Sequence, residues 1–135
     1  MRAGRVLGNR RQLAAVVRNL VDNAYRHARA RVAVSVTTGV DAVVVDVDDD
    51  GPGIPPGERE QVFERFARLG EGRARDEGGA GLGLALVRRV VETHGGNAHV
   101  EPGPLGGARF EVRSPGHRDA AVGALDLARD ETRRL

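Results

Sequence analysis

The sequence lacks cysteine, lysine and tryptophan, and it contains a single tyrosine. Without cysteine, disulfides and thiolate metal sites are excluded, so any metal ion must bind through oxygen or nitrogen. No apolar run approaches the roughly 20 residues needed to span a bilayer, and the N-terminal residues lack the apolar stretch of a signal peptide. At 135 residues the chain has the length of one soluble domain with a single core.

The charge is nearly balanced although the isoelectric point is high. The formal net charge is +2 at pH 7, and the sequence pI is about 10.2. Arginine supplies every basic side chain other than histidine, so few groups titrate between about pH 8 and 11 and the titration curve is flat there. Aromatic residues make up only 3% of the chain and arginines alternate with acids, so we do not expect nucleic acid as a partner.

Apolar spacing predicts two long helices. In residues 9–28 one helical face carries the apolar side chains Leu13, Val16, Val17, Leu20 and Ala24. A second helix is predicted from Gly81 to a glycine cap at His94–Gly96. A short helix is predicted from Glu58 to Phe66, and the charged, glycine-rich residues 70–79 are predicted to form a mobile flap.

Alternating apolar residues predict two hairpins. The first joins strands at 31–38 and 42–48, and the second joins strands near 98–100 and 108–112. Before the first helix, only Gly4 to Leu7 could supply a strand. Interleaved helices and hairpins predict an α+β fold, a two-layer α/β sandwich whose mixed, mostly antiparallel sheet is covered on one face by helices. Residues 1–115 are expected to form this domain and residues 116–135 a C-terminal tail.

One polar face of the first helix has ligand-binding chemistry. Asn19, Asn23, Arg26 and His27 recur at helical spacing, and their face borders the apolar stripe instead of opposing it. Amide oxygens suit Mg²⁺, which uses few protein ligands when phosphates supply the others, and arginine complements phosphate. A merely solvated helix face fits the same pattern equally well.

An acidic, glycine-rich segment follows the second strand. Asp49 has the same parity as Val45 and Val47, so its carboxylate should point to the core side, where it needs a partner such as an exocyclic amine. Gly51 and Gly53 would let the chain turn and let a flat ring approach closely. An ordinary acidic turn after a strand would look similar.

A glycine-rich segment, Gly78 to Leu84, opens the second helix. Glycines there free backbone amides to surround phosphate, and the helix dipole adds to the attraction. The segment is not a Walker A loop, because no Gly-Lys-Ser/Thr follows, and it does not lie in a Rossmann βαβ unit.

In this order and spacing, the segments resemble the nucleotide-binding boxes of the histidine kinase family, within the gyrase-type ATPase superfamily. Asn19 to Ala24 resembles the N box, Asp49 to Ile54 the G1 box, Phe63 to Phe66 the F box and Gly79 to Leu84 the G2 box. The resemblance covers roughly residues 5–114. It implies the ATP-binding catalytic domain of a bacterial two-component sensor histidine kinase, with ATP and Mg²⁺ as cofactors.

The resemblance also implies residue roles. Asn23 would bind Mg²⁺, Arg26 and Arg68 would contact phosphate, and Asp49 would receive the adenine amino group. His27 occupies a position where many relatives stack a tyrosine near adenine, and residues 67–80 would form a lid. The remaining nucleotide contacts would come from Gly51, Gly53, Ile54, Gly79, Gly81, Leu82 and Gly83.

Two positions depart from the pattern of relatives. Asn19 stands where hydrolytic relatives commonly have a general-base glutamate, and an amide cannot accept a proton in that role. This residue therefore favours transfer of phosphate to a partner over hydrolysis. Ala80 stands where relatives often have threonine, so one hydroxyl contact to phosphate would be missing.

The implied reaction passes the γ-phosphoryl group to a histidine on a separate dimerisation domain, and then to an aspartate of a response regulator. We expect none of the histidines present, His27, His94, His99 and His117, to be the acceptor. The chain would be the cytoplasmic domain of an often membrane-anchored receptor, without direct membrane contact. Two alternatives remain open: a stand-alone serine kinase of the anti-sigma-factor type and a degenerate nucleotide-binding interaction module. An acceptor domain encoded upstream, and ATP binding itself, would separate them.

Overall fold

The computed structural model describes residues 10–64 and 80–116, together with Asp126 and Arg129. The predicted strand at Gly4 to Leu7, the predicted flap and most of the predicted tail lie outside these residues. The elements in chain order are α1 (Arg10–His27), β1 (Val32–Gly39), β2 (Ala42–Asp49), η2 (Pro56–Glu58), η3 (Gln61–Phe63), α2 (Ala80–Thr93), β3 (Asn97–Pro102) and β4 (Ala108–Pro115).

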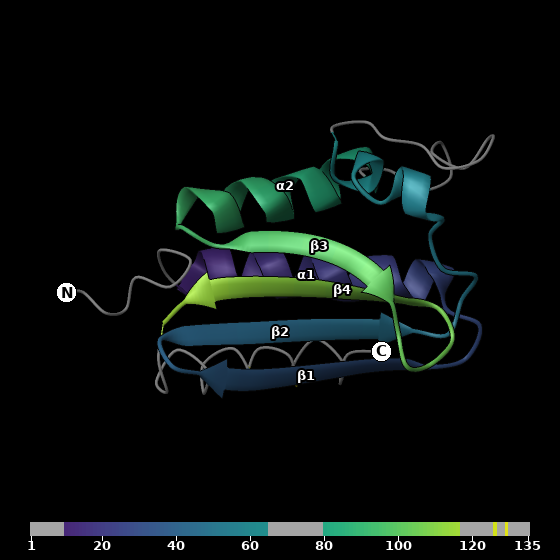
Figure 1. Ribbon diagram of the computed structural model, residues 1–135, viewed down its shortest axis with the longest axis horizontal. Helices are drawn as coiled ribbons and strands as arrows, with labels where there is room; N and C mark the ends of the chain where they lie inside the picture. Colours follow the sequence, from purple (N-terminus) through teal and green to yellow (C-terminus); the bar gives the residue numbers. More distant parts are fainter. Residues whose placement is uncertain (1–9, 65–79, 117–125, 127–128, 130–135) are drawn as a thin grey trace.

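Two hairpins build one sheet with the strand order β1-β2-β4-β3 (Figure 1). All three described pairings are antiparallel, and the central pairing of β2 with β4 places Val45 opposite Val112 and Val47 opposite Phe110. The tight turn between β1 and β2 holds Asp41 at a φ of 60°, a conformation that aspartate tolerates better than most residues. The predicted hairpins are therefore confirmed, and within the described residues the sheet is wholly antiparallel.

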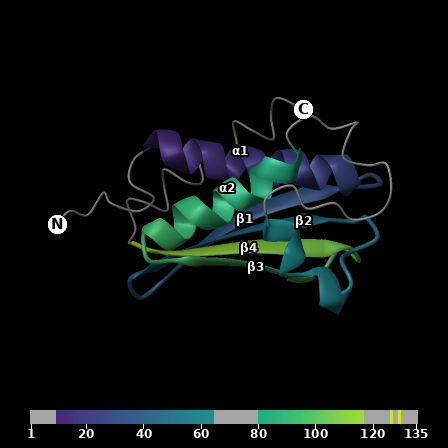
Figure 2. The same cartoon turned by 90° about the horizontal axis from the view of Figure 1, so that it is seen from above.

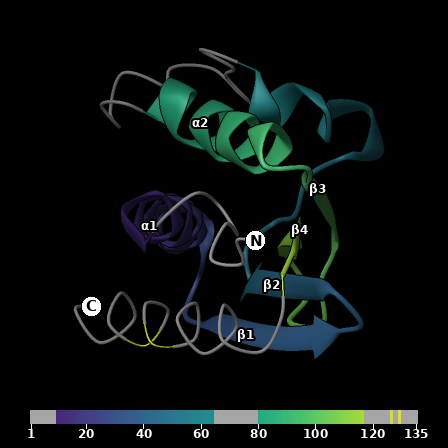
Figure 3. The same ribbon diagram turned by 90° about the vertical axis from the view of Figure 1, so that its left-hand side faces the viewer.

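Both helices lie on the same face of the sheet, which Figures 2 and 3 show from two directions. The core fills the space between these layers and is made mainly of valine and leucine from α1, α2, β2 and β4. The predicted two-layer α/β sandwich is confirmed. No helix in residues 10–64 and 80–116 is long and apolar enough to cross a membrane.

Helix α1 forms because its apolar residues return to one side at every turn. Val16, Val17, Leu20 and Val21 are almost completely buried. Truncating one of them, for example Leu20→Ala, would cost roughly 2 to 5 kcal/mol of stability through lost burial and the cavity left behind. Arg26 and His27 lie in the last turn, where positive charge complements the helix dipole.

Helix α2 ends as the sequence predicts. Gly95 adopts a φ of 86°, and the Gly96 N–H donates to the carbonyl of Val91 at 2.9 Å, which is a Schellman-type cap. The buried face of the helix carries Leu84, Val87 and Val91. This cap turns the chain directly into β3.

The short helix predicted from Glu58 to Phe66 is not one continuous helix in the described residues. Two single 3-10 turns, η2 and η3, stand in its place, and Glu64 then adopts an extended conformation with φ −84° and ψ 150°. The reason is tertiary packing, since the Phe63 ring is buried edge-on against Phe110 with centroids 6.0 Å apart. Phe66 lies outside the described residues.

Candidate functional site

Three chain segments that are distant in sequence meet at one end of the domain. The end of α1, the end of β2 and the beginning of α2 all lie on the right-hand side of Figure 1. These are the segments that carry the predicted site residues. The antiparallel order of the sheet and the direction of the two helices produce this convergence.

Asp49 is the most buried charged residue of the site, with 2% of its surface exposed. Its Oδ1 accepts hydrogen bonds from the backbone N–H of Gly51 at 2.9 Å and of Ala108 at 3.3 Å. Oδ2 takes part in neither bond. The strand parity therefore predicted the direction of this side chain correctly, and two backbone donors hold the carboxylate in one orientation.

The surroundings of Asp49 leave no room for side chains at two glycines. A Cβ at Gly107 would overlap Asp49 Oδ1 and would lie 2.6 Å from the backbone nitrogen of Gly51. A Cβ at Gly51 would overlap the carbonyl oxygen of His27. Close approach of backbone segments therefore requires glycine at both positions, and the space beside Gly51 is occupied by the protein itself.

Asn23 faces the interior from α1 and is 9% exposed. Its Nδ2 atom is buried and has no hydrogen-bond partner among the described residues. Leaving a buried amide without a partner costs roughly 1 to 3 kcal/mol, so folded proteins usually provide a partner. An unpaired N–H donor at this place fits a residue that completes its contacts with an acceptor oxygen of a bound ligand.

Asn19 lies one turn earlier on the same face of α1 and contacts the beginning of α2. Its Nδ2 donates to the carbonyl of Ala15 at 2.8 Å, within its own helix. A Cβ at Gly83 would come within 3.0 Å of Asn19 Oδ1, so this oxygen lies against the first turns of α2. Asn19 thus connects the two helices near the predicted phosphate end.

The last turn of α1 brings two basic residues to the same end. Arg26 is exposed, and His27 is half-buried with its carbonyl packed beside Gly51. Since α-helical residues three and four apart share a face, Arg26 lies on the same side as Asn23. The predicted polar face of α1 is confirmed as a face that borders the core.

Helix α2 begins at Ala80, so Gly81, Leu82 and Gly83 belong to its first turn. The first turn of a helix has free backbone N–H groups, which favour anions. Arg68 and Gly79 lie outside the described residues, as does most of the predicted lid. In the segment that follows β2, Gly53 adopts a φ of 78°, and Ile54 is half-buried against the core.

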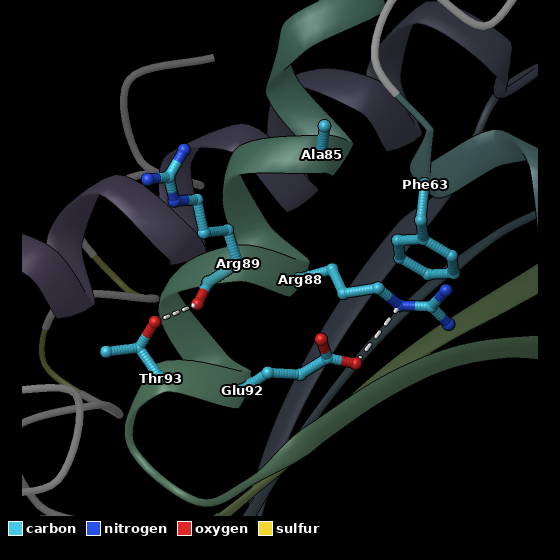
Figure 4. A pocket seen from close by; sticks show the side chains of 6 residues that line it. All are labelled: Phe63, Ala85, Arg88, Arg89, Glu92 and Thr93. Carbon is cyan, nitrogen blue, oxygen red and sulfur yellow. Dashed lines mark hydrogen bonds and ion pairs between the residues drawn. The ribbon is translucent and has the colours of Figure 1, made fainter.

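An open pocket of about 500 Å³ lies along another side of α2, and none of the predicted site residues lines it (Figure 4). At its edge Arg88 stacks over the Phe63 ring with its guanidinium carbon 4.2 Å from the centroid. Arg88 also donates to Glu60 at 2.7 Å and to the Ala98 carbonyl at 2.9 Å. These contacts hold the segment around η3 against α2 and β3. The pocket therefore lies where these elements pack together, away from the predicted site residues.

Sequence reasoning missed three residues that shape the site. Ala108 supplies a backbone donor to Asp49, Gly107 makes room for it, and Asp50 accepts hydrogen bonds from backbone N–H groups beyond the end of α1. Gly106 and Gly107, the paired glycines before β4, could have indicated a close backbone contact, because only one of them is needed for a tight turn. Nothing in the sequence indicated their contact with Asp49.

Comparison with known proteins identifies the family and the fold of this chain. Residues 8–118 match the family described as histidine kinase-, DNA gyrase B- and HSP90-like ATPase. The chain is similar to the sensor histidine kinase CpxA of Escherichia coli, at 41% identity over 80% of this chain and 24% of CpxA. It is also similar to the sensor-type histidine kinase PrrB of Mycobacterium tuberculosis, at 45% identity over 77% of this chain and 23% of PrrB. The chain thus spans about a quarter of these relatives.

Solved structures show the same fold. The crystal structure of the ATP-binding domain of PrrB from Mycobacterium tuberculosis matches with a TM-score of 0.60 at 40% identity, covering 81% of this chain and 68% of that one. The mycobacterial sensor histidine kinase MprB matches with a TM-score of 0.67 at 36% identity, covering 76% and 71%. With the family match extending over most of its length, this chain belongs to the histidine kinase-, DNA gyrase B- and HSP90-like ATPase family.

Proposed function

We propose that this chain binds Mg²⁺-ATP and donates the γ-phosphoryl group to a histidine on a separate dimerisation domain of a sensor kinase. The observation that carries the proposal is the buried Asp49 carboxylate, held by two backbone donors at the same end of the domain as the unpaired Asn23 amide. The carboxylate of Asp49 can accept a hydrogen bond from a base, and the amide of Asn23 suits the phosphate end of a nucleotide.

At the adenine end, Asp49 is the recognition residue. A carboxylate with one oxygen already occupied by two N–H donors presents its other oxygen as an acceptor, and adenine offers an exocyclic amine as donor. Gly53 and Ile54, which follow Asp49 in the chain, and His27, whose carbonyl packs beside Gly51, would form the walls beside the base. Guanine carries an oxygen at the corresponding position, so the same carboxylate would repel it.

At the phosphate end, Asn23 is the proposed Mg²⁺ ligand. Magnesium keeps several waters and uses few protein groups when phosphates supply oxygens, so one amide oxygen is a sufficient protein contribution. The bound ion would supply neutralisation of charge on the phosphoryl oxygens. Arg26 and the amides of Gly81, Leu82 and Gly83 would add positive potential, and we assign further phosphate contacts to Arg68 and Gly79.

Positioning of the reactants and neutralisation of phosphoryl charge would accelerate the reaction, as expected for phosphoryl transfer. The Asn19 side chain already donates to its own helix and carries no basic group, so it cannot take a proton from water. This supports transfer to a nucleophile of a partner and argues against efficient hydrolysis. The proposed acceptor is a histidine outside this chain, which then passes the phosphate to a response regulator. Since ATP and Mg²⁺ are cytoplasmic reactants, we place the domain on the cytoplasmic side of a membrane-anchored receptor.

The test is phosphotransfer in trans. The chain is mixed with radiolabelled ATP, Mg²⁺ and the dimerisation domain encoded with it, and a second reaction uses that domain with its acceptor histidine changed to glutamine. The expected result is acid-labile label on the first acceptor and none on the second, since phosphohistidine is acid-labile. Acid-stable label on a serine-containing partner would instead establish the serine kinase alternative, and absence of any transfer would refute the proposed reaction.

A further inference from the structure

Asp50 connects two loops that meet at the nucleotide end of the domain. Its Oδ1 accepts the backbone N–H of Arg29 at 2.7 Å and of Ala30 at 3.0 Å, and its Oδ2 lies 3.2 Å from the Ala30 nitrogen. These donors lie about 20 residues away in sequence, just after α1 ends. The side chain therefore joins the end of α1 to the segment that follows β2.

The neighbouring residues make the junction tighter. Asp49 turns inward to the core, and Gly51 packs directly against the His27 carbonyl, where a Cβ would clash. Three consecutive residues thus have different roles. Asp49 points inward, Asp50 holds the chain beyond α1 by hydrogen bonds, and Gly51 allows the end of α1 to approach. The contact of Gly51 with the His27 carbonyl sets the distance between the end of α1 and the segment after β2. The hydrogen bonds of Asp50 to Arg29 and Ala30 fix the position of the chain beyond α1 relative to that segment.

The charge of Asp50 is stabilised by the junction itself. The backbone N–H of Ala30, with those of Arg31 and Arg29, holds the pKa of this carboxyl below its usual range. A carboxylate near the C-terminus of a helix is otherwise unfavourable, because the helix dipole is negative there. The hydrogen bonds to the chain beyond the helix end offset this repulsion.

A shift at the end of α1 would move the groups assigned to the phosphate end. Arg26 precedes Arg29 by three residues, Asn23 precedes it by six, and both lie in the last two turns of α1, which lead directly to Arg29. Asp49, which is assigned to the adenine end, is adjacent to Asp50 on the other side of the junction. Asp50 therefore lies between the two halves of the site.

We propose that Asp50 is a positioning residue that sets the spacing between the adenine-binding carboxylate and the metal- and phosphate-binding groups of α1. The inference rests on the proposed function, because it assumes one nucleotide bound across both halves. It assigns Asp50 no contact with the ligand. The two halves would each remain intact without it, but they would no longer fit the same nucleotide.

The expected signature is a change in the ratio of two affinities. Asp50→Ala should weaken binding of a non-hydrolysable ATP analogue with Mg²⁺ by about tenfold, which is roughly the effect of losing one hydrogen bond to a charged group. Adenosine, which uses only the adenine end, should lose less than about twofold. The Asp50→Asn variant should restore the wild-type ratio, because its amide oxygen can still accept both N–H donors.

Controls distinguish this role from a general loss of stability. Asp126→Ala removes the same charge from an exposed residue and should leave both affinities unchanged. Thermal unfolding by circular dichroism checks that each variant folds. If Asp50→Ala does not fold, Asp50→Ser provides the same comparison, since its shorter side chain cannot reach both amides as the carboxylate does.

Failure of the proposed function and failure of the positioning role of Asp50 would give different results. If the wild-type chain does not bind the ATP analogue, the proposed function fails. If the wild type binds and Asp50→Ala shows the wild-type ratio of analogue to adenosine affinity, or loses both affinities equally, Asp50 has no positioning role. Failure of Asp50→Asn to restore the ratio would also overturn the inference, because it would assign the effect to charge instead of geometry.

Discussion

The backbone N–H of Ala108 donates to Oδ1 of Asp49 at 3.3 Å, across 59 residues of sequence. This bond ties the beginning of β4 to the end of β2, and the pairing of these two central strands determines its position. The orientation of the only almost fully buried carboxylate among the described site residues therefore depends on the hairpin between β3 and β4.

Gly107→Ala should disturb this carboxylate. The added Cβ would overlap Asp49 Oδ1, so the hairpin or the carboxylate must shift, at a cost of about 1 to 3 kcal/mol typical of overpacking. We expect a lower unfolding temperature and about tenfold weaker binding of an ATP analogue. Gly57→Ala is the matched control, because nothing lies within 4 Å of its Cβ position. Equal affinities of both variants would show that the hairpin does not orient Asp49.

Asp49→Asn should reduce the discrimination between adenine and guanine nucleotides. The amide oxygen would keep the two backbone donors now at Oδ1, which places the NH₂ group where Oδ2 stands. A donor there opposes the adenine amine and suits the guanine oxygen, and a charged hydrogen bond is typically worth about 1.5 to 3 kcal/mol. Competition between ATP and GTP analogues measures the change, and unchanged selectivity would refute the assigned role.

Asn23→Ala should remove the Mg²⁺-dependent part of nucleotide affinity. We expect about tenfold weaker binding of the ATP analogue with Mg²⁺, equivalent to about 1.4 kcal/mol, and little change in the presence of EDTA. Transfer to a supplied acceptor domain should be abolished. Asn97→Ala, at an exposed position on β3, is the control. Full transfer by Asn23→Ala would reassign the metal ligand.

The stability of the protein should depend on pH through Asp46, a buried carboxyl of β2. Asp46 lies opposite Glu111 on β4 and opposite Ser35 on β1. Burial raises the pKa of Asp46 to about 7, with further increases from the hydrogen bond and the negative charge of Glu111 and from Asp48, and Arg109 acts in the opposite direction. The described charged groups that face this carboxyl are therefore one cation and two acids.

Because the pKa of Asp46 is higher in the folded state than its ordinary value of 3.8, its contribution to stability is complete below about pH 4 and is lost as the pH rises through 7. Asp46→Asn should remove that loss and make the protein more stable than wild type at pH 8 by on the order of 1 kcal/mol, allowing for solvent screening. Urea unfolding followed by circular dichroism at pH 5 and 8 measures it, with Asp126→Asn as the control. Parallel pH profiles for wild type and Asp46→Asn would contradict the prediction.

Local patterns predicted most of the fold because they reflect local rules. The periodicities of α1, α2 and the four strands, and the parity of Asp49 with Val45 and Val47, are properties of one segment at a time. The short helix predicted from Glu58 to Phe66 is divided into 3-10 turns, and the packing of Phe63 on Phe110, which joins distant segments, could not be read from the local pattern.

The same distinction applies to the site. The polar residues of α1 and the glycine-rich beginning of α2 could be identified from spacing and from resemblance to the family. The supports of Asp49 could not, because Ala108 and Gly107 reach it only through the register of β2 with β4. The role of Asp50 was hidden for the same reason, since its partners follow another element.

The most direct test of the central claim is isothermal titration calorimetry of the purified chain with a non-hydrolysable ATP analogue and Mg²⁺. We expect a single saturable site, weaker binding when Mg²⁺ is chelated, and much weaker binding of the corresponding GTP analogue. Absence of saturable binding by the folded chain, or equal affinity for the two nucleotides, would contradict the assignment of this domain end as an adenine nucleotide site.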